Sequence, residues 1–420
     1  MESFSDKLKA LGIHPVAGDA VRRPGAPDRE HDEAQSSGAR FPIESVVQGV
    51  ELNTAFGTTF ISEQIFPEDH QQGSVALNAK VSPTILAQWA KVPNVFAGGL
   101  AHVAFLDTET SGLAGGTGTY AFLVGIGFRI GNGFKLVQIF MRDPGQEPAL
   151  LAAITQVLEP FDTIVTFNGR SFDVPLLKTR HVLNGFTSPF ANLHHVDLLP
   201  LARRIWRNRL PSRALSSLEN DILGLQRTRE EVPGWMIPGI YFDYLRTGDA
   251  RPLEGVFYHN AMDIVSLAAL FNYMADMLEA PLGNPVLPGL DLVALARLYE
   301  ELEDFETAIL LYERGLDQGL PKEFFIQTLE RFAQLYRRQE KWENAIDLWK
   351  KAAGHKYLEA HIELAKYYEH QQRDYDQAIL WTNVAIGLVL ETETNPFIRK
   401  SLSNDLQKRL NRLLKKKGEI

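Results

Sequence analysis

The sequence contains no cysteine, which excludes structural disulfides and zinc sites built from thiolates. It has no uninterrupted apolar run of the roughly 18 residues that a membrane span needs. Its first residues also lack the apolar core of a signal peptide. Of the 420 residues, 45% are hydrophobic and 23% are charged, a composition that predicts two or three packed domains. We therefore expect a soluble protein of the cytoplasm.

An excess of positive charge is also missing, since the formal net charge is −9. This value argues against a uniform nucleic-acid-binding surface. Five arginines nevertheless fall within eleven residues that contain no acid: Arg203, Arg204, Arg207, Arg209 and Arg213. We expect Arg203, Arg204 and Arg207 to bind the phosphates of a nucleic acid, and Trp206 between them to stack on a base. The alternative is a solvated helix face that Trp206 anchors in the core.

Acidic residues occur at three separated places in patterned surroundings. Asp107 and Glu109 end the apolar run Val103 to Leu106, which predicts a buried strand that presents both carboxylates on one face. Asp173 follows the stretch Thr166 to Phe172, and Asp263 lies in a predicted helix from Gly255 to Ala275. If folding brings them together, the four carboxylates can hold two divalent cations.

The chemistry of phosphodiester hydrolysis explains why this residue type matters. A pair of cations about 3.5–4 Å apart activates the attacking water and stabilises charge on the leaving oxygen. Mg²⁺ and Mn²⁺ prefer oxygen ligands, so we expect Asp107, Glu109, Asp173 and Asp263 to bind two ions of Mg²⁺ or Mn²⁺. Asp107 as a turn residue and Asp173 as a helix N-terminal residue are the structural alternatives.

The order of predicted elements between residues 101 and 280 indicates an α/β fold. Strands are predicted at 103–109, 120–128, 134–141, 163–167 and 195–198, with helices at 150–158 and 174–182. The Gly-Asn-Gly sequence at 131–133 predicts a hairpin between the second and third strands. Three antiparallel strands, helix, strand, helix and strand is the order of a ribonuclease H-like domain, with a mixed five-stranded sheet and flanking helices.

Residues 101–280 resemble the YprB-like family of ribonuclease H-like domains, which is related to the DEDD-type 3′–5′ exonucleases. The residues that carry the resemblance are 106–113, which are similar to the first exonuclease motif, and 167–175, which closely resemble the second. The resemblance implies a two-metal nuclease, most plausibly a 3′–5′ exonuclease acting on single-stranded DNA or RNA. By their place beside the second motif, Asn168 and Arg170 are expected to position the scissile strand.

The third motif departs from the pattern of this superfamily, which has a tyrosine four residues or a histidine five residues before the last aspartate. Here Tyr258 stands five residues and His259 four residues before Asp263. On a helix, the fourth residue back lies about 40° from Asp263 and the fifth about 140° away. His259 is therefore the better candidate for the general base, because histidine as a residue type is suited to removing a proton from water near neutral pH.

The segments outside this domain differ in character. Residues 1–40 are rich in turn formers and predict a mobile arm, and residues 41–100 predict a small module with a hairpin and a short helix. Residues 281–290 are a Pro/Gly-rich linker. Residues 291–420 resemble tetratricopeptide repeats, because Ala308, Ala345 and Ala378 lie 37 and 33 residues apart in similar surroundings. The repeats are expected to bind a protein or peptide, or to buttress the nuclease domain, and the basic tail to cap them with a solvated face.

Two other function classes compete with the exonuclease. A catalytically weak or inactive adaptor would grip nucleic acid with the ribonuclease H-like domain and recruit partners through its repeats, and the exchanged order of Tyr258 and His259 favours it. A structure-selective endonuclease is the third possibility, since one fold hosts several activities. The sequence does not distinguish DNA from RNA.

Overall fold

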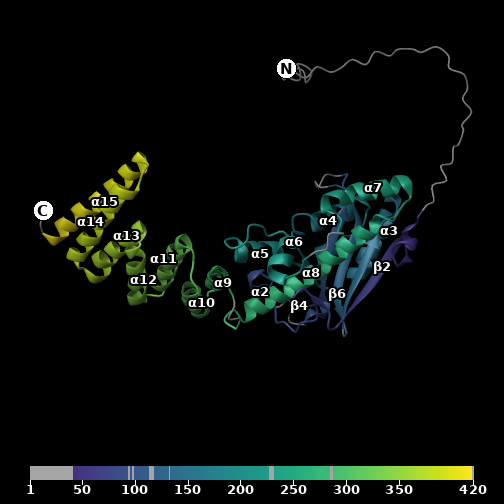
Figure 1. Ribbon diagram of the computed structural model, residues 1–420, viewed down its shortest axis with the longest axis horizontal. Coiled ribbons are helices and arrows are strands. Elements are labelled where there is room, and N and C mark those ends of the chain that lie inside the picture. Colours follow the sequence, from purple (N-terminus) through teal and green to yellow (C-terminus); the bar gives the residue numbers. More distant parts are fainter. Residues whose placement is uncertain are drawn as a thin grey trace, which may run out of the picture. The chain divides into compact units, whose positions relative to one another are not determined.

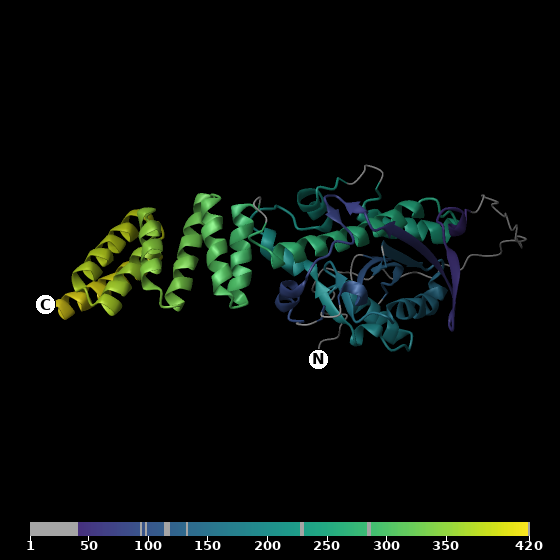
Figure 2. The same ribbon diagram turned by 90° about the horizontal axis from the view of Figure 1, so that it is seen from below.

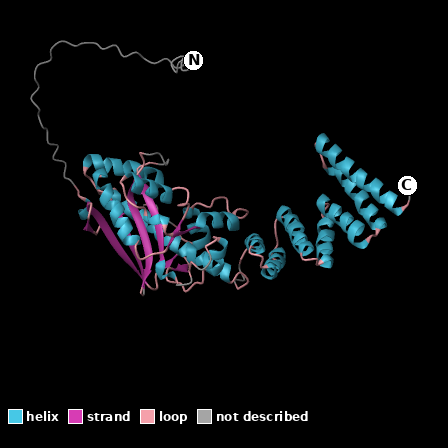
Figure 3. Ribbon diagram, turned by 180° about the vertical axis from the view of Figure 1, so that it is seen from behind, coloured by secondary structure: helices cyan, strands magenta, loops and turns pink. Residues whose placement is uncertain are grey.

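The computed structural model describes residues 41–92, 95–96, 99–112, 118–131, 133–226, 231–283 and 287–418. The mobile arm expected at residues 1–40 lies outside the described residues. A mixed α/β region is followed along the chain by helices alone (Figure 3). Both parts of the predicted fold class are thereby confirmed.

The α/β region is built on a seven-stranded sheet with the order β1-β2-β7-β6-β5-β8-β9. Its strands are β1 (Val50–Thr54), β2 (Gly57–Pro67), β5 (Val103–Thr110), β6 (Ala121–Ile130), β7 (Gly133–Phe140), β8 (Thr163–Thr166) and β9 (His194–Asp197). Strands β5, β8 and β9 run parallel to one another, and the other pairs are antiparallel. The mixed sheet is as predicted, with two strands more than the expected five.

The two additional strands come from the segment that the sequence places in a separate N-terminal module. Strand β2 pairs with β7 from Phe60 to Pro67, and β1 forms the outer edge. Without them the backbone groups of β7 would lie unpaired at an open edge. A short two-stranded sheet of β3 (Gln71–Gln72) and β4 (Val75–Ala76) follows, and then α2 (Thr84–Trp89).

Alternate residues of β5 face two different helical layers. Val103 and Phe105 pack in a core with α2, α5 (Leu198–Trp206) and α8 (Leu253–Glu279). Ala104 and Leu106 pack on the opposite face with α3 (Glu147–Leu158), α4 (Asp173–Leu183) and α7 (Ile237–Thr247). Figure 1 shows α8 and α3 along the sheet. The sheet is thus buried on both faces, which explains why its central strands are almost wholly apolar.

Helix α8 lies unusually close to β6. A Cβ atom added at Gly125 would stand 2.4 Å from Asn260 Oδ1, and one at Gly127 would stand 2.4 Å from Ile264 Cγ2. The two glycines therefore let the helix approach the sheet where a larger side chain would hold it away. By length and composition alone α8 would suffice to cross a membrane, but 78% of its most apolar window is buried, as in the core helix of a folded domain.

The C-terminal part consists of paired helices in chain order (Figure 2). They are α9 (Gly289–Glu301), α10 (Phe305–Asp317), α11 (Lys322–Arg338), α12 (Trp342–Gly354), α13 (Leu358–Tyr367), α14 (Tyr375–Thr392) and α15 (Pro396–Lys417). Ala308, Ala345 and Ala378 are fully buried near the start of the second helix of each pair. This is the close helix contact that the repeat pattern predicts.

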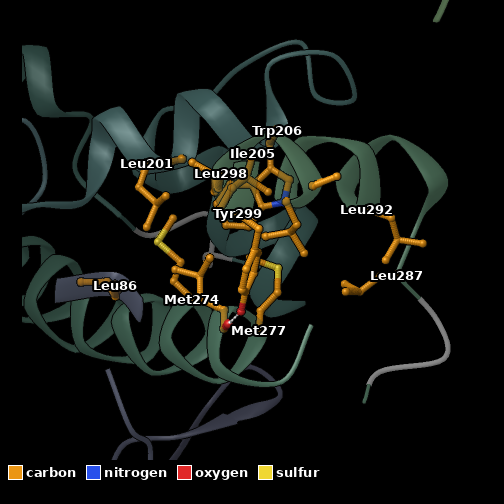
Figure 4. Close-up of a cluster of buried hydrophobic side chains, with 14 of the residues drawn as sticks. Leu86, Leu201, Ile205, Trp206, Met274, Met277, Leu287, Leu292, Leu298 and Tyr299 are labelled. Atoms are coloured by element: carbon orange, nitrogen blue, oxygen red, sulfur yellow. Dashed lines mark hydrogen bonds between the residues drawn. The ribbon is translucent and has the colours of Figure 1, made fainter. Parts of the chain in front are cut away.

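The first repeat shares a core with the α/β region. Trp206 of α5 is fully buried among side chains of α8 and α9, including Met274 and Leu298 (Figure 4). The expectation that Trp206 stacks on a base is therefore wrong, because its ring has no exposed face. Sequence proximity to arginines suggested a binding role, whereas burial in the core decides its position. Residues 284–286 of the expected linker lie outside the described part of the chain.

Helix α15 closes the repeats, and three of its basic side chains contact one buried carboxylate. Glu369, 2% exposed, is contacted by Arg409 at 2.7 Å, by Arg412 at 2.9 Å and by Lys416 at 2.9 Å. The expectation that the basic face of the tail is solvated is wrong for Arg409, whose side chain is 16% exposed, whereas Arg412 and Lys416 keep 49% and 40% exposure beside the same carboxylate. A buried acid on the preceding repeat holds them, and a sequence pattern does not reveal that acid.

Candidate metal centre

The structure brings the four predicted carboxylates together beside the carboxyl end of the central strand β5. We call the side of the sheet where the parallel strands β5, β8 and β9 end its carboxyl edge. Asp107 and Glu109 come from β5, Asp173 is the first residue of α4, and Asp263 lies on α8. The charges of Asp263, Asp173 and Glu109 all act on Asp107. A bulge between Glu109 and Thr110 interrupts the pairing with β6 at this point, a feature that often re-aims side chains beside active sites. We call these four residues the carboxylate cluster.

Asp107 lies at the centre of this cluster. Burial, and then the charges of Asp263, Asp173 and Glu109, raise the pKa of Asp107 well above its usual range. Asn260 Nδ2 donates to Asp107 Oδ2 at 3.0 Å and partly opposes the shift. Ionisation of Asp107 is therefore unfavourable in free energy, and a bound cation would offset this cost.

Asn260 contacts the carboxylate cluster and was missed by sequence reasoning. It is fully buried, and its Oδ1 accepts a hydrogen bond from Gln138 Nε2 at 3.0 Å while its Nδ2 binds Asp107. Gln138 in turn donates to the carbonyl of Phe257 at 2.8 Å. The space for this side chain exists because Gly125 is the residue paired with Asp107. Only the packing of α8 on β6 shows this role.

Asp173 meets β5 through the Thr108 hydroxyl, which donates to Asp173 Oδ1. Burial raises the pKa of Asp173 to about 6, although the hydrogen bond from Thr108 acts in the opposite direction. Asp173 also stands at the N-terminus of α4, where a carboxylate is stabilised by the helix dipole. The structural alternative and the metal-binding interpretation therefore apply to the same side chain.

His259 lies within the carboxylate cluster, as the helical spacing predicts. Its Nε2 is 3.6 Å from Asp263 Oδ2 and 3.9 Å from Glu109 Oε1. Tyr258, the preceding residue, is 44% exposed on the surface of α8. Because α8 begins at Leu253, both residues lie well inside the helix and point in different directions. The geometry thus separates the two members of the exchanged pair.

Glu231 is the second residue near the site, after Asn260, that no sequence pattern singled out. Its Oε1 lies 2.9 Å from His259 Nδ1, on the other side of the ring from Asp263 and Glu109. Single ligand atoms of Glu231, His259 and Asp263 all lie within 4.8 Å of one another and could hold a metal ion. Glu231 follows no strand or motif, and only the fold brings it to the histidine.

Asp197 binds the backbone of the second motif through its carboxylate. Its carboxylate accepts from the amides of Asn168 at 2.8 Å, Arg170 at 3.0 Å and Leu199 at 3.0 Å. Asn168 adopts the left-handed conformation, with φ of 67°. An aspartate between an apolar strand and a helix is a usual N-cap, so its position was recognisable from the sequence. The hydrogen bonds that it accepts from the turn at residues 168–170 were not predictable from the sequence.

The predicted nucleic-acid-binding arginines have different surroundings. Arg170 Nη2 donates to the carbonyl of His195 at 2.8 Å, and its side chain stays exposed. Arg203 and Arg207 are exposed on α5 and at its C-terminal end. Arg204 forms an ion pair with Glu301 of the first repeat. The Arg204 side chain stays 39% exposed in this pair, so its binding to a phosphate remains a prediction.

The chemistry of the carboxylate cluster fits a divalent cation. Its donors are carboxylate oxygens, which hard cations prefer. The side chains of Asp107 and Asp173 accept hydrogen bonds from the neutral side chains of Asn260 and Thr108, respectively. Both carboxyl groups have raised pKa values, so positive charge beside them would stabilise their ionised forms. Among the described residues, the group whose ligand atoms lie close enough to share one ion is Glu231, His259 and Asp263, which has Asp263 in common with this cluster. Metal binding by all four carboxylates stays a prediction.

Comparisons with known proteins agree with this fold. Residues 104–275 match the RNase H superfamily, and residues 292–323 match a tetratricopeptide repeat. YprB of Bacillus subtilis (strain 168) is 32% identical over 285 residues, which cover 66% of this chain and 67% of YprB. A family B DNA polymerase from the archaeon Pyrobaculum calidifontis is similar with 17% identity and a TM-score of 0.33, over 52% of this chain and 29% of the polymerase.

The superfamily points to a role as a nuclease or in nucleic-acid binding, and the repeats point to protein interaction. The predicted resemblance is confirmed in both parts of the chain. Because it is 32% identical to YprB over two thirds of that protein and matches the RNase H superfamily over residues 104–275, the chain belongs to the YprB family of ribonuclease H-like proteins.

Proposed function

We propose that this protein is a divalent-metal-dependent nuclease, and specifically a 3′–5′ exonuclease that acts on single-stranded nucleic acid. The observation that carries the proposal is the convergence of Asp107, Glu109, Asp173 and Asp263 at the carboxyl edge of the sheet, with a histidine among them. Fold membership alone would not distinguish a nuclease from a binding protein. The residues of the site supply the reason to choose hydrolysis.

The four carboxylates would hold two ions of Mg²⁺ or Mn²⁺. Ions held there would supply the charge that lowers the pKa of a bound water and stabilises the phosphate oxygens. The protein fixes the ligands from three elements that share a core, and Asn260 and Thr108 orient two of them. Such support for the ligands is what keeps a metal site in a productive arrangement.

His259 would accept the proton of the attacking water at Nε2, the nitrogen on the side of Asp263 and Glu109. Glu231 near Nδ1 favours the tautomer that carries its proton on Nδ1, which leaves Nε2 free to accept. Tyr258, exposed on another side of α8, has no part in this step.

Labelled substrates test the proposal directly. Purified protein is incubated with end-labelled single-stranded DNA and RNA, duplexes and circular single strands, with Mg²⁺ or Mn²⁺ and with a chelated control. Asp107→Asn is the matched variant, because it keeps the side-chain shape and removes one charged ligand. We expect stepwise release of nucleotides from the 3′ end of linear single strands by the wild type only, and intact circles.

The alternatives give different results in the same experiment. Cleavage of circles would identify a structure-selective endonuclease. Metal-independent binding without any hydrolysis, in wild type and variant alike, would identify an adaptor and contradict the proposed activity. For the repeats we propose a protein or peptide partner, which a pull-down with residues 322–420 deleted would fail to retain. This variant keeps α9 and α10, the helices of the repeat that shares a core with the α/β region.

A further inference from the structure

A groove of about 520 Å³ opens beside the second motif, and the proposed activity leaves it without a role. Its walls come from the end of β8, from α5 and from the segment that follows α5. Six of the residues that line it are Phe167, Asn168, Leu199, Arg203, Arg213 and Leu215.

The groove lies on the carboxyl edge of the sheet, as does the carboxylate cluster. Strands β5, β8 and β9 are parallel neighbours, so their carboxyl ends lie together. Asp107 and Glu109 are at that end of β5, and Asn168 follows that end of β8. Neighbouring strands are about 4.8 Å apart, which places the groove roughly 5–10 Å along the edge from the carboxylates. A strand bound at the carboxylates would reach it with an adjacent nucleotide.

The groove has the charge that a phosphate requires. Arg203 is exposed, and among the residues that the structure describes no acid pairs with it. Arg213 is fixed by hydrogen bonds from its Nη1 to the carbonyls of Leu210 and Pro211, both at 3.0 Å. Its Nε is buried and has no partner in the described protein. Leu199 and Leu215 add apolar surface against which a sugar or base can pack.

One carboxylate fixes two walls of the groove. Asp197 accepts from the amide of Asn168 at 2.8 Å and from that of Leu199 at 3.0 Å. Asn168 lies five residues before Asp173, so the turn that shapes the groove also leads to a member of the carboxylate cluster. The groove is thus preformed and linked to the site by a short rigid segment.

We propose that this groove binds a nucleotide of the single strand adjacent to the scissile bond, with its phosphate at Arg203 and Arg213. This inference rests on the proposed function for the identity of the ligand. It concerns binding, and so it can be tested separately from hydrolysis.

The test measures the binding of fluorescent oligothymidylate and oligouridylate to the full chain carrying Asp107→Asn, at several salt concentrations. Arg203→Gln should weaken binding roughly fivefold to tenfold and reduce the log–log salt slope by about 0.7, the value for one lost contact to a single strand. Ala214→Trp, which adds bulk to the rim, should weaken binding and leave the slope unchanged. Arg246→Gln on α7 removes a positive charge away from the groove and should change affinity less than twofold.

Unchanged affinity and slope in both folded groove variants would overturn the proposal, and so would equal weakening by Arg246→Gln, which would indicate only a general charge effect. If the wild type hydrolyses no substrate but the groove variants lose binding as expected, the groove stands and the proposed activity fails. If hydrolysis is observed and the groove variants bind normally, the groove proposal alone fails.

Discussion

The buried carboxylate of Glu369 and the carboxylate cluster have surroundings that shift their pKa values in opposite directions. Burial would raise the pKa of Glu369, but hydrogen bonds from Arg412 and Lys416, and the charges of Arg412 and His370, lower it to about 2. At the carboxyl edge of the sheet, burial and neighbouring acids raise the pKa of Asp107, and burial raises that of Asp173 to about 6. Basic side chains of the protein already neutralise Glu369, whereas a cation bound from solution would stabilise the ionised carboxylate cluster. This difference separates a structural acid from a candidate metal ligand.

The largest expected effect concerns hydrolysis. Asp107→Asn and Asp173→Asn should each lower metal-dependent cleavage by roughly 10³-fold or more, because each removes a ligand at which charge is stabilised during the reaction. The same variants should keep or slightly raise the free energy of unfolding without metal, since repulsion among carboxylates decreases. Cleavage assays and urea unfolding measure the two quantities. Full cleavage by both variants would contradict the assignment.

His259→Ala should lower the rate by roughly 10² to 10⁴-fold, the usual contribution of a general base. Tyr258→Phe is the matched control, since Tyr258 lies next to His259 but is exposed elsewhere on α8, and it should cost less than about threefold. Single-turnover rates at saturating metal measure both. A larger loss in Tyr258→Phe would show that the tyrosine hydroxyl, and not the imidazole, handles the proton.

Glu369→Gln should lower the free energy of unfolding by roughly 3 kcal/mol, because three basic side chains lose the buried charge that they contact. Glu391→Gln is the control, as it removes an exposed ion pair with Lys356 and should cost at most about 1 kcal/mol. Urea unfolding followed by circular dichroism measures both variants. Equal, small losses would mean that Glu369 does not hold α15 in place.

The free energy of unfolding should depend on pH through Glu369 and Asp173 in different pH ranges, with a change of roughly 1 kcal/mol from each. The pKa of Glu369 is lowered on folding from an ordinary 4.5 to about 2, so its contribution is present above pH 4.5 and is lost as the pH falls toward 2. The pKa of Asp173 is raised from 3.8 to about 6, so its contribution is present below pH 3.8 and is lost as the pH rises through 6.

Thermal unfolding of metal-free Asp173→Asn and Glu369→Gln across this pH range provides the measurement. Asp173→Asn should remove the loss of stability between pH 4 and 6, and Glu369→Gln the loss at lower pH. Added Mn²⁺ should have a similar effect to Asp173→Asn at neutral pH, because it binds the ionised folded state. If wild type and both variants had the same pH profile, folding would not shift the pKa values of Glu369 and Asp173 in opposite directions.

The sequence predicted what depends on local pattern and missed what depends on distant contacts. Apolar runs and helical spacing gave the central strands, α8 and the placement of His259 beside Asp263. The same patterns did not reveal that β2 extends the sheet, or that Glu231 reaches His259 from outside every motif. Arg204 and Arg203 are adjacent in sequence, and only the fold shows that Glu301 binds the first. Such partners are set by tertiary packing.

The most direct test of the account is the position of Mn²⁺ in crystals of the protein, located by anomalous diffraction. We predict two ions about 3.5–4 Å apart, held by Asp107, Glu109, Asp173 and Asp263, and loss of at least one ion in Asp107→Asn. A single ion held by Glu231, His259 and Asp263, the other group that could bind a metal, would contradict the two-metal centre and the role of His259 as a base. Crystals saturated with Mn²⁺ that hold no ion at either place would contradict a metal-dependent activity altogether.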